Sequence, residues 1–332
     1  MKTKFALATG LALLVFSVMP AFAQTTYNFT TVQSPGDPAF TQLLGINDSG
    51  TIAGYFGDGT IVPNNGFTLT LPNNYTPENF PGAAQTQVVG INALGETDGF
   101  YINAAGVTNG FTDVNGTLMT IDAPNTAFNQ LLGLNNSGVL SGYSSATDVT
   151  GMTGQEAYID NSGKFTYLSS FLPSGIGNNQ ATGVNNSGDI AGFYLTNGGA
   201  DSDGFLLSPS GSGYSLASLE APGSTFTQAL GINNDGDIVG TYITSTSAMD
   251  GFIYNIATGT YETINDPLGV GTTTVNGIND KGDLVGFYVD ASDNTDGFVA
   301  TPTPEPAGLL LFGTGLLGLG LLTKKRWSVV RD

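Results

Sequence analysis

Acidic residues are the main candidates for chemistry in this chain, because its 332 residues include 27 Asp and Glu but no His and no Cys. The missing residue types exclude a Cys/His zinc site, a thiol nucleophile, an imidazole base and any disulfide. Two short patterns, Asp201-Ser202-Asp203 and Asp235-Gly236-Asp237, offer paired carboxylate oxygens of the kind that Ca²⁺ prefers, although neither completes a calcium loop with its closing Glu. These aspartates are the candidate metal ligands, and no other cofactor is expected.

Carboxylates could also hydrolyse a polysaccharide, if two of them faced each other across a cleft at about 5–10 Å. The sequence selects no such pair, so no catalytic residue is assigned. The glutamates at five positions follow no repeat pattern and are expected to have surface roles: Glu78, Glu96, Glu156, Glu220 and Glu262. The formal net charge of −19 argues against binding to nucleic acid or to anionic lipid.

An amide is the other recurrent polar group, because one motif that contains Asn occurs six times along the chain. The consensus sequence of the motif is Gly-Ile-Asn-x-x-Gly-x-Ile-x-Gly-Phe/Tyr, and successive copies begin 43 to 50 residues apart. The repeated asparagines are Asn47, Asn92, Asn135, Asn185, Asn233 and Asn279. A ring of amides could line a channel and bind sugar hydroxyls, but a need shared by six repeats is better explained by an Asx turn that holds a hairpin. The aromatic residues that end the motif, such as Tyr55, Phe193 and Phe287, are expected to pack in the core.

Each repeat is expected to form four short strands. The first strand ends at the Ile-Asn of the motif, and the second follows the Asn-x-x-Gly turn. A second motif, Asp/Asn-Gly-Phe, lies in the third strand of five repeats and is replaced by Glu156-Ala157-Tyr158 in repeat three. The fourth strand is an aromatic and β-branched run that ends near a Pro. Alternating apolar residues in strands this short indicate antiparallel sheets.

Four strands in each unit of about 45 residues indicate an all-β fold, namely a six-bladed β-propeller over residues 24–300. The last repeat lacks a fourth strand, whereas an unpaired segment with the fourth-strand pattern, Tyr27–Pro35, precedes the first repeat. In a ring, this N-terminal strand would complete the last blade and remove an exposed sheet edge. The alternative fold is a parallel β-solenoid with two coils in each repeat.

The repeat motif resembles the HAF-type extracellular repeats over about residues 27–300, and this resemblance implies an exported β-repeat protein with no defined reaction. Residues 1–23 agree with export, because they have the three parts of a secretory signal peptide. Lys2 and Lys4 form the positive start, and Phe5–Met19 is mostly apolar. Ala21-Phe22-Ala23 then has the small-x-small pattern that a signal peptidase needs.

A second sorting segment is expected at the C-terminus. Residues 301–306 are a Pro-rich linker that ends in Pro304-Glu305-Pro306, and residues 307–323 form a short apolar transmembrane helix. A basic cytoplasmic tail over 324–332 begins with Lys324, Lys325 and Arg326. This order resembles the PEP-CTERM sorting signal of Gram-negative bacteria. The resemblance implies cleavage by an exosortase near the Pro-Glu-Pro, and passage from the inner membrane to the cell surface or extracellular matrix, often alongside exopolysaccharide production.

Between the two sorting segments, residues 24–323 carry 26 acidic residues and only two basic ones, Lys164 and Lys281. Such a charge keeps a protein soluble and repels other polyanions unless divalent cations bridge them. We therefore expect a monomeric, surface-sorted repeat protein with a structural or binding role in the exopolysaccharide matrix. The alternatives are a carboxylate-dependent polysaccharide hydrolase or lyase, and a surface adhesin that binds another protein.

Overall fold

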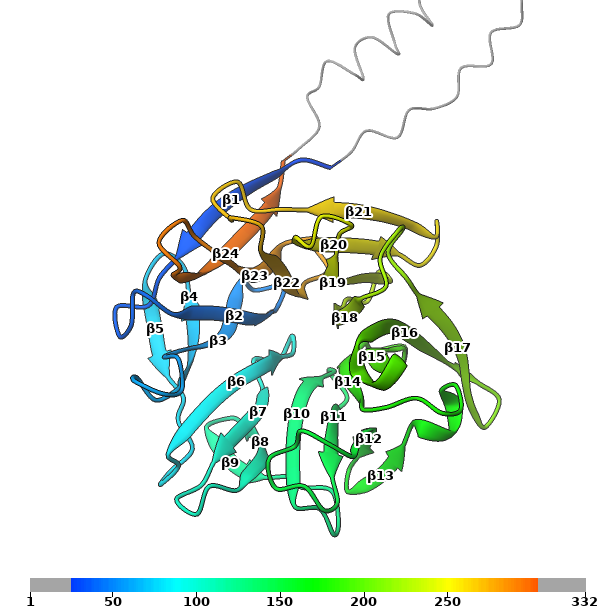
Figure 1. The fold of residues 1–332 in the computed structure, drawn as a ribbon. Coiled ribbons are helices and arrows are strands. Elements are labelled where there is room, and N and C mark those ends of the chain that lie inside the picture. Colours follow the sequence, from blue (N-terminus) through cyan, green and yellow to red (C-terminus); the bar gives the residue numbers. More distant parts are fainter. Residues whose placement is uncertain (1–24, 304–332) are drawn as a thin grey trace, which may run out of the picture.

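The computed structural model describes residues 25–303, which form six four-stranded sheets around a central axis (Figure 1). The predicted all-β, six-bladed β-propeller is therefore confirmed, and the β-solenoid alternative is wrong. Within these residues, no helix is long and apolar enough to cross a membrane.

Several sequence-based expectations concern segments outside the described residues. They are the signal peptide with Ala21 and Ala23, the sorting motif Pro304-Glu305-Pro306, the transmembrane helix at 307–323, and the basic residues Lys324, Lys325 and Arg326.

The first three blades each contain four consecutive strands, with the first strand nearest the axis. Blade one contains β2 (Thr41–Ile46), β3 (Thr51–Phe56), β4 (Asn65–Thr70) and β5 (Asn74–Pro77). Blade two contains β6 (Gln85–Ile91), β7 (Thr97–Ile102), β8 (Thr108–Val114) and β9 (Thr117–Thr120). Blade three contains β10 (Phe128–Leu134), β11 (Val139–Ser145), β12 (Gln155–Asn161) and β13 (Lys164–Tyr167).

Blades four and five follow the same order, with two short 3-10 helices, η1 (Ser169–Phe171) and η2 (Asn197–Gly199), beside blade four. Blade four contains β14 (Asn179–Val184), β15 (Ile190–Thr196), β16 (Asp201–Ser210) and β17 (Gly213–Leu219). Blade five contains β18 (Thr227–Ile232), β19 (Asp237–Ile243), β20 (Met249–Asn255) and β21 (Thr260–Ile264).

Blade six joins the two ends of the ring. It contains β22 (Thr273–Ile278), β23 (Leu284–Val289), β24 (Thr295–Pro302) and the N-terminal β1 (Tyr27–Val32). Strand β1 pairs antiparallel with β24 over its whole length, from Tyr27 opposite Pro302 to Val32 opposite Gly297. This is the strand that the sequence analysis expected to complete the last blade, and in Figure 1 the blue β1 lies beside the orange β24. The pairing covers the edge that β24 would otherwise expose.

The motif glycines meet two backbone needs. Gly50 has a φ of 77°, a left-handed conformation that lets the Asn-x-x-Gly turn close. Gly54 and its equivalents lie against the inner strand of their own blade. A Cβ at Gly54 would lie 2.4 Å from the main-chain oxygen of Gln42, and one at Gly240 would lie 1.9 Å from that of Gln228. The second strand can therefore approach the first only with glycine at this position.

The aromatic residue of the second motif, Asp/Asn-Gly-Phe, packs between neighbouring blades. Five phenylalanines at this position are at most 2% exposed: Phe67, Phe111, Phe205, Phe252 and Phe298. In blade three the equivalent Tyr158 is equally buried, and its hydroxyl donates to Asn129 Oδ1 at 2.9 Å. Blade three therefore keeps the aromatic core residue and supplies the hydrogen-bond acceptor that a buried phenol requires.

Candidate functional site

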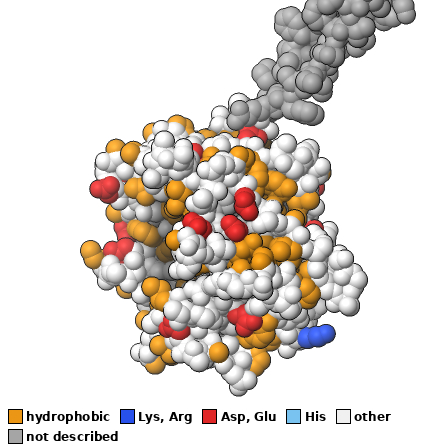
Figure 2. Space-filling model, turned by 45° about the vertical axis from the view of Figure 1, so that its right-hand side comes forward, with side chains coloured by type: hydrophobic (Ala, Val, Ile, Leu, Met, Phe, Trp, Pro, Cys, Tyr) orange, Lys and Arg blue, Asp and Glu red, His pale blue; other side chains and the backbone are white. Residues whose placement is uncertain are grey.

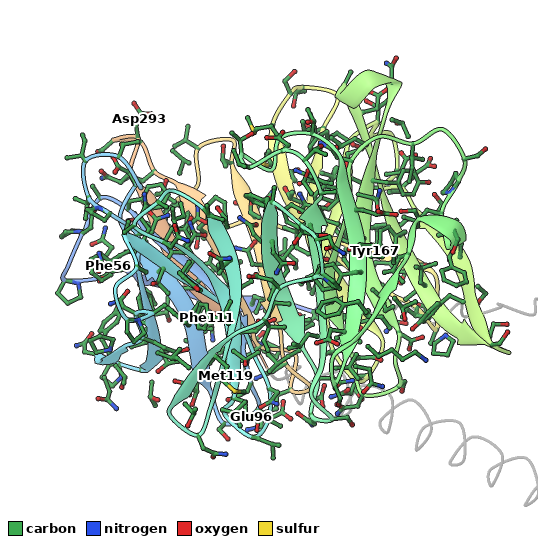
Figure 3. All side chains as sticks on the ribbon, turned by 90° about the horizontal axis from the view of Figure 1, so that it is seen from below. Phe56, Glu96, Phe111, Met119, Tyr167 and Asp293 are labelled. Atoms are coloured by element: carbon green, nitrogen blue, oxygen red, sulfur yellow. The ribbon has the colours of Figure 1, made fainter. Side chains whose placement is uncertain are left out.

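The ring has two faces, and each face carries one mouth of the central channel. The inner strands of the six blades surround the axis (Figure 1). The Asn-x-x-Gly turns that follow the inner strands lie on one side, here called the turn face. The loops between the second and third strands of each blade lie on the other side, here called the loop face. Figure 3 shows Glu96 at the turn face and Asp293 at the loop face, on opposite sides of the molecule.

The six motif asparagines form a closed belt at the turn face. Asn47 Oδ1 accepts the backbone N–H groups of Ser49 and Thr51 at 3.0 and 3.1 Å, and the other five make the same Asx-turn contacts. Each Nδ2 also donates to the main-chain oxygen of the equivalent Asn in the next blade, at 3.0 to 3.2 Å, and the last bond joins Asn279 to Asn47. These side chains are only 4–6% exposed. The belt therefore links the blades to one another.

A second, incomplete belt lies one residue further along each turn. Five side chains accept the main-chain N–H of the equivalent residue in the preceding blade, at 2.8 to 2.9 Å: Asn136, Asn186, Asn234, Asp280 and Asp48. Ala93 interrupts this belt, because its side chain has no acceptor. The cavity at this mouth has a volume of about 80 Å³. Its polar groups are largely paired with one another, so the turn face acts as a clamp on the ring.

The loop-face mouth is larger and has a different character. Its cavity has a volume of about 240 Å³, and its rim includes Gln42, Gln87, Gln130, Gln180, Tyr55 and Phe100. Each of these glutamines lies opposite an aromatic residue in the neighbouring strand of its own blade, as Gln42 lies opposite Tyr55. The sequence analysis placed the aromatic position in the core, and Tyr55 is indeed buried, but Tyr55 and Phe100 also line this mouth.

Tyrosine hydroxyls fix two of the rim glutamines. Tyr55 donates to Gln42 Oε1 at 2.8 Å, and Tyr143 donates to Gln130 Oε1 at 2.8 Å. Because each carbonyl accepts from a tyrosine, each amide NH₂ keeps its donors for another partner. In blade four, Gln180 Nε2 donates to Gln155 Oε1 at 2.9 Å.

The floor of the loop-face mouth is apolar. Leu44, Val89, Leu132 and Leu230 contribute to it. Two polar residues at the same level turn to the backbone instead: Thr182 donates to Ala229 O at 2.9 Å, and Asn276 donates to Leu43 O at 3.0 Å. The mouth therefore combines an amide and aromatic rim with an apolar base, the usual pattern of a small-molecule site.

The candidate calcium ligands are not brought together. Asp201 and Asp203 lie in β16 of blade four, whereas Asp235 and Asp237 lie at the β18–β19 turn of blade five. Asp237 accepts hydrogen bonds from Asn255 and Asn233 at 2.6 and 3.4 Å. Over residues 25–303, no group of three or more acidic side chains is arranged to hold a metal ion.

One buried carboxylate, Asp98, was not singled out from the sequence. It is fully buried, and its Oδ1 accepts the N–H of Gly90 at 2.8 Å. Its Oδ2 has no hydrogen-bond partner among the described residues. Burial raises the pKa of Asp98 to about 7, although N–H groups of Gly90 and Gly133 lower it in part. The signal was present in the repeat: the equivalent positions hold Ala53, Ser141, Ala191, Val239 and Val285.

Glu78 also departs from its expected surface role. It is half-buried, and its carboxylate contacts the Thr97 hydroxyl. Burial raises the pKa of Glu78 to about 7, an effect that the Thr97 hydrogen bond opposes. A raised pKa is a mark of acid catalysts, but a general acid must reach its substrate. Because Asp98 is enclosed in the protein, these two groups do not form a pair of the kind that glycoside hydrolysis needs.

Comparison with known proteins supports the architecture. No protein-family model matches this sequence, and no curated protein matches it. A TolB structure from Agrobacterium tumefaciens is 12% identical, with a TM-score of 0.54 over 85% of this chain and 100% of that chain. AofleA from Arthrobotrys oligospora is 11% identical, with a TM-score of 0.50 over 84% and 90% of the two chains. Likeness at such low identity shows the β-propeller fold alone.

Proposed function

We propose that this protein is an exported, surface-sorted propeller that binds the extracellular polysaccharide matrix and has a structural or binding role there. The loop-face mouth carries the proposal. It is a formed cavity of about 240 Å³, with amide and aromatic groups at the rim, on a ring closed by hydrogen bonds from blade to blade. A rigid ring of this kind can present such groups with little loss of conformational freedom on binding.

The two terminal segments support the export part of the proposal. The signal-peptide pattern of residues 1–23 and the PEP-CTERM resemblance of residues 301–332 imply export and then processing by an exosortase. The chain would thus be a membrane intermediate before it reaches the cell surface.

Surface charge sets the conditions for matrix binding. Figure 2 shows acidic side chains scattered over the visible face, where basic side chains are rare. Lys164 and Lys281 are the only basic residues between positions 24 and 323. An acidic glycan would be repelled by this surface at long range, and divalent cations would reduce the repulsion. We therefore expect matrix binding to be strengthened by millimolar calcium.

Co-sedimentation tests the proposal. The full chain, in a mild detergent, is mixed with the host's own exopolysaccharide and pelleted with millimolar calcium or with a chelator. We expect weak co-sedimentation that increases with calcium, and no release of reducing ends or unsaturated sugars. Failure to pellet under either condition contradicts the proposal. Turnover of the polysaccharide would favour a hydrolase or lyase, and retention that is lost when the matrix is treated with protease would favour a protein-binding adhesin.

A further inference from the structure

We infer that the loop-face mouth is a binding site for a single neutral sugar ring, a pyranose held by rim glutamines and by Phe100. This inference rests on the proposed function and assigns its binding to one site. The site differs from the one that the sequence motif offered as a sugar-binding candidate, which was the ring of motif asparagines now placed at the turn face.

The chemistry of the lining selects a neutral ligand. None of the residues that line this mouth carries a formal charge, although the protein as a whole is strongly acidic. A uronate or an amine bound here would lose hydration without gaining an opposite charge in the site. Sugar hydroxyls lose less hydration free energy than a charged group when they enter the site. The side-chain amides can form the hydrogen bonds that the hydroxyls made to water before binding.

The rim donors are fixed before a ligand arrives. The hydroxyls of Tyr55 and Tyr143 hold Gln42 and Gln130 by their carbonyl oxygens, so the amide N–H groups of these two side chains remain as donors. Gln87 has Phe100 as its partner across the strand pair, and a phenylalanine ring cannot occupy its amide. Gln87 is therefore able to donate and to accept, as a ligand with several hydroxyls requires.

Phe100 gives the site an apolar wall. It is only half-buried, in contrast to Tyr55 and Tyr143 at the equivalent positions of blades one and three. The C–H groups of a pyranose can lie against an aromatic ring while its hydroxyls meet the amides, and an aromatic side chain contributes a large contact area at low conformational cost.

The size and shape of the cavity limit the ligand to one ring. Its volume of 240 Å³ is below the range of roughly 300–1,000 Å³ that is usual for sites of drug-sized ligands. The next cavity along the channel has a volume of only about 80 Å³ and is lined by motif residues such as Gly45 and Ile46. A sugar chain would therefore dock through one residue at the mouth and would not thread the channel.

The rim is uneven, which supplies a matched control. Blades one to four contribute glutamines to the lining, whereas Gln228, at the same repeat position in blade five, is not part of it. Gln228 lies opposite Thr241 rather than an aromatic residue. Replacement of Gln228 removes the same chemical group from the same strand position without changing the site.

Saturation-transfer NMR of the full chain in a mild detergent tests the inference. The probes are the methyl pyranosides of glucose, galactose and mannose, with glucuronate as the charged comparison. We expect signal transfer to at least one neutral pyranoside and weaker transfer to glucuronate. Gln87→Ala should weaken the binding of that pyranoside by about ten-fold. This is the usual effect of removing one hydrogen-bonding side chain and leaving the ligand hydroxyl without its partner. Phe100→Leu should weaken it as well, and Gln228→Ala should leave it unchanged.

Three results would overturn the inference: no transfer to any neutral pyranoside, equal or stronger transfer to glucuronate, or equal losses in Gln87→Ala and Gln228→Ala. Folding is checked by the melting temperature of each variant, and Phe100→Leu keeps the site testable if Gln87→Ala is unstable. Co-sedimentation separates this inference from the broader proposal. Matrix binding that persists in a variant with no pyranoside binding leaves the proposed function standing and refutes the site.

Discussion

Replacement of Asp98 by Asn should make the protein more stable than the native chain near neutral pH, but not in acid. Asp98 is fully buried, and only one of its two carboxyl oxygens has hydrogen-bond partners. Burial raises its pKa from 3.8 to about 7. In the unfolded chain the same group ionises near its ordinary pKa. The folded state thus binds the Asp98 proton more tightly than the unfolded state does.

The sign and size follow from this difference. A carboxyl group whose pKa is raised by folding contributes its full stability below the unfolded pKa, and this contribution is lost as the pH rises through the folded pKa. A difference of about three pH units corresponds to about 4 kcal/mol of unfolding free energy, at about 1.4 kcal/mol per unit. The loss occurs between about pH 4 and pH 7. Asn cannot ionise, and its oxygen can still accept from the Gly90 N–H.

Urea unfolding of the native chain and of Asp98→Asn, at several pH values across this range, measures the effect. We expect the stability of the variant relative to the native chain to increase by up to about 4 kcal/mol as the pH rises. Other titrating groups are present in both proteins and largely cancel in the difference. Glu78 is the exception, because its charge helps to raise the pKa of Asp98, and its interaction with Asp98 is therefore part of the measured difference. Asp98→Ser is the second variant, because Ser141 occupies the equivalent position in blade three. A difference that is constant with pH in both variants would refute the reasoning.

Three further predictions concern the ring and its sorting. Deletion of Tyr27–Val32 should leave β24 with an open edge, so the melting temperature should fall and the protein should aggregate. Calorimetry and size-exclusion chromatography measure the two effects. A variant that stays monomeric with an unchanged melting temperature would show that β1 is dispensable for ring closure. Asn185→Ala removes the acceptor of two turn N–H groups and the bond to Asn233, so it should lower the unfolding free energy by about 2–3 kcal/mol. The control Asn186→Ala removes the acceptor of one N–H group and should lower it by about 1 kcal/mol. Equal losses for the two variants in urea unfolding would contradict the proposed role of the asparagine belt. Replacement of Pro304-Glu305-Pro306 by three alanines should leave full-length protein in the membrane fraction on immunoblots, and normal maturation would reject the sorting hypothesis.

The number of blades and the order of strands could be predicted because they depend on local patterns that repeat. Alternating apolar residues, an Asx turn after each inner strand and an Asp/Asn-Gly-Phe sequence in the third strand are each readable within a few residues. Ring closure could be predicted for a related reason: the last repeat lacks the strand pattern that Tyr27–Val32 supplies. The blade-three departure, Tyr158 in place of Phe, was recognised as a change in the motif, whereas its hydrogen bond to Asn129 was not.

The sites were decided by contacts between blades, which no local pattern specifies. The turn role of Asn47 is readable from its own hairpin, but its Nδ2 partner is the main chain of Asn92, 45 residues away. Gln87 and Phe100 lie on two strands of one blade, and they become part of a binding surface only when the curvature of the ring brings all six blades to one mouth. Asp98 is one acidic residue among 27 in the sequence. Its high pKa arises because the packing of blades two and three removes it from water, and burial is a property of the closed ring rather than of the residues beside it.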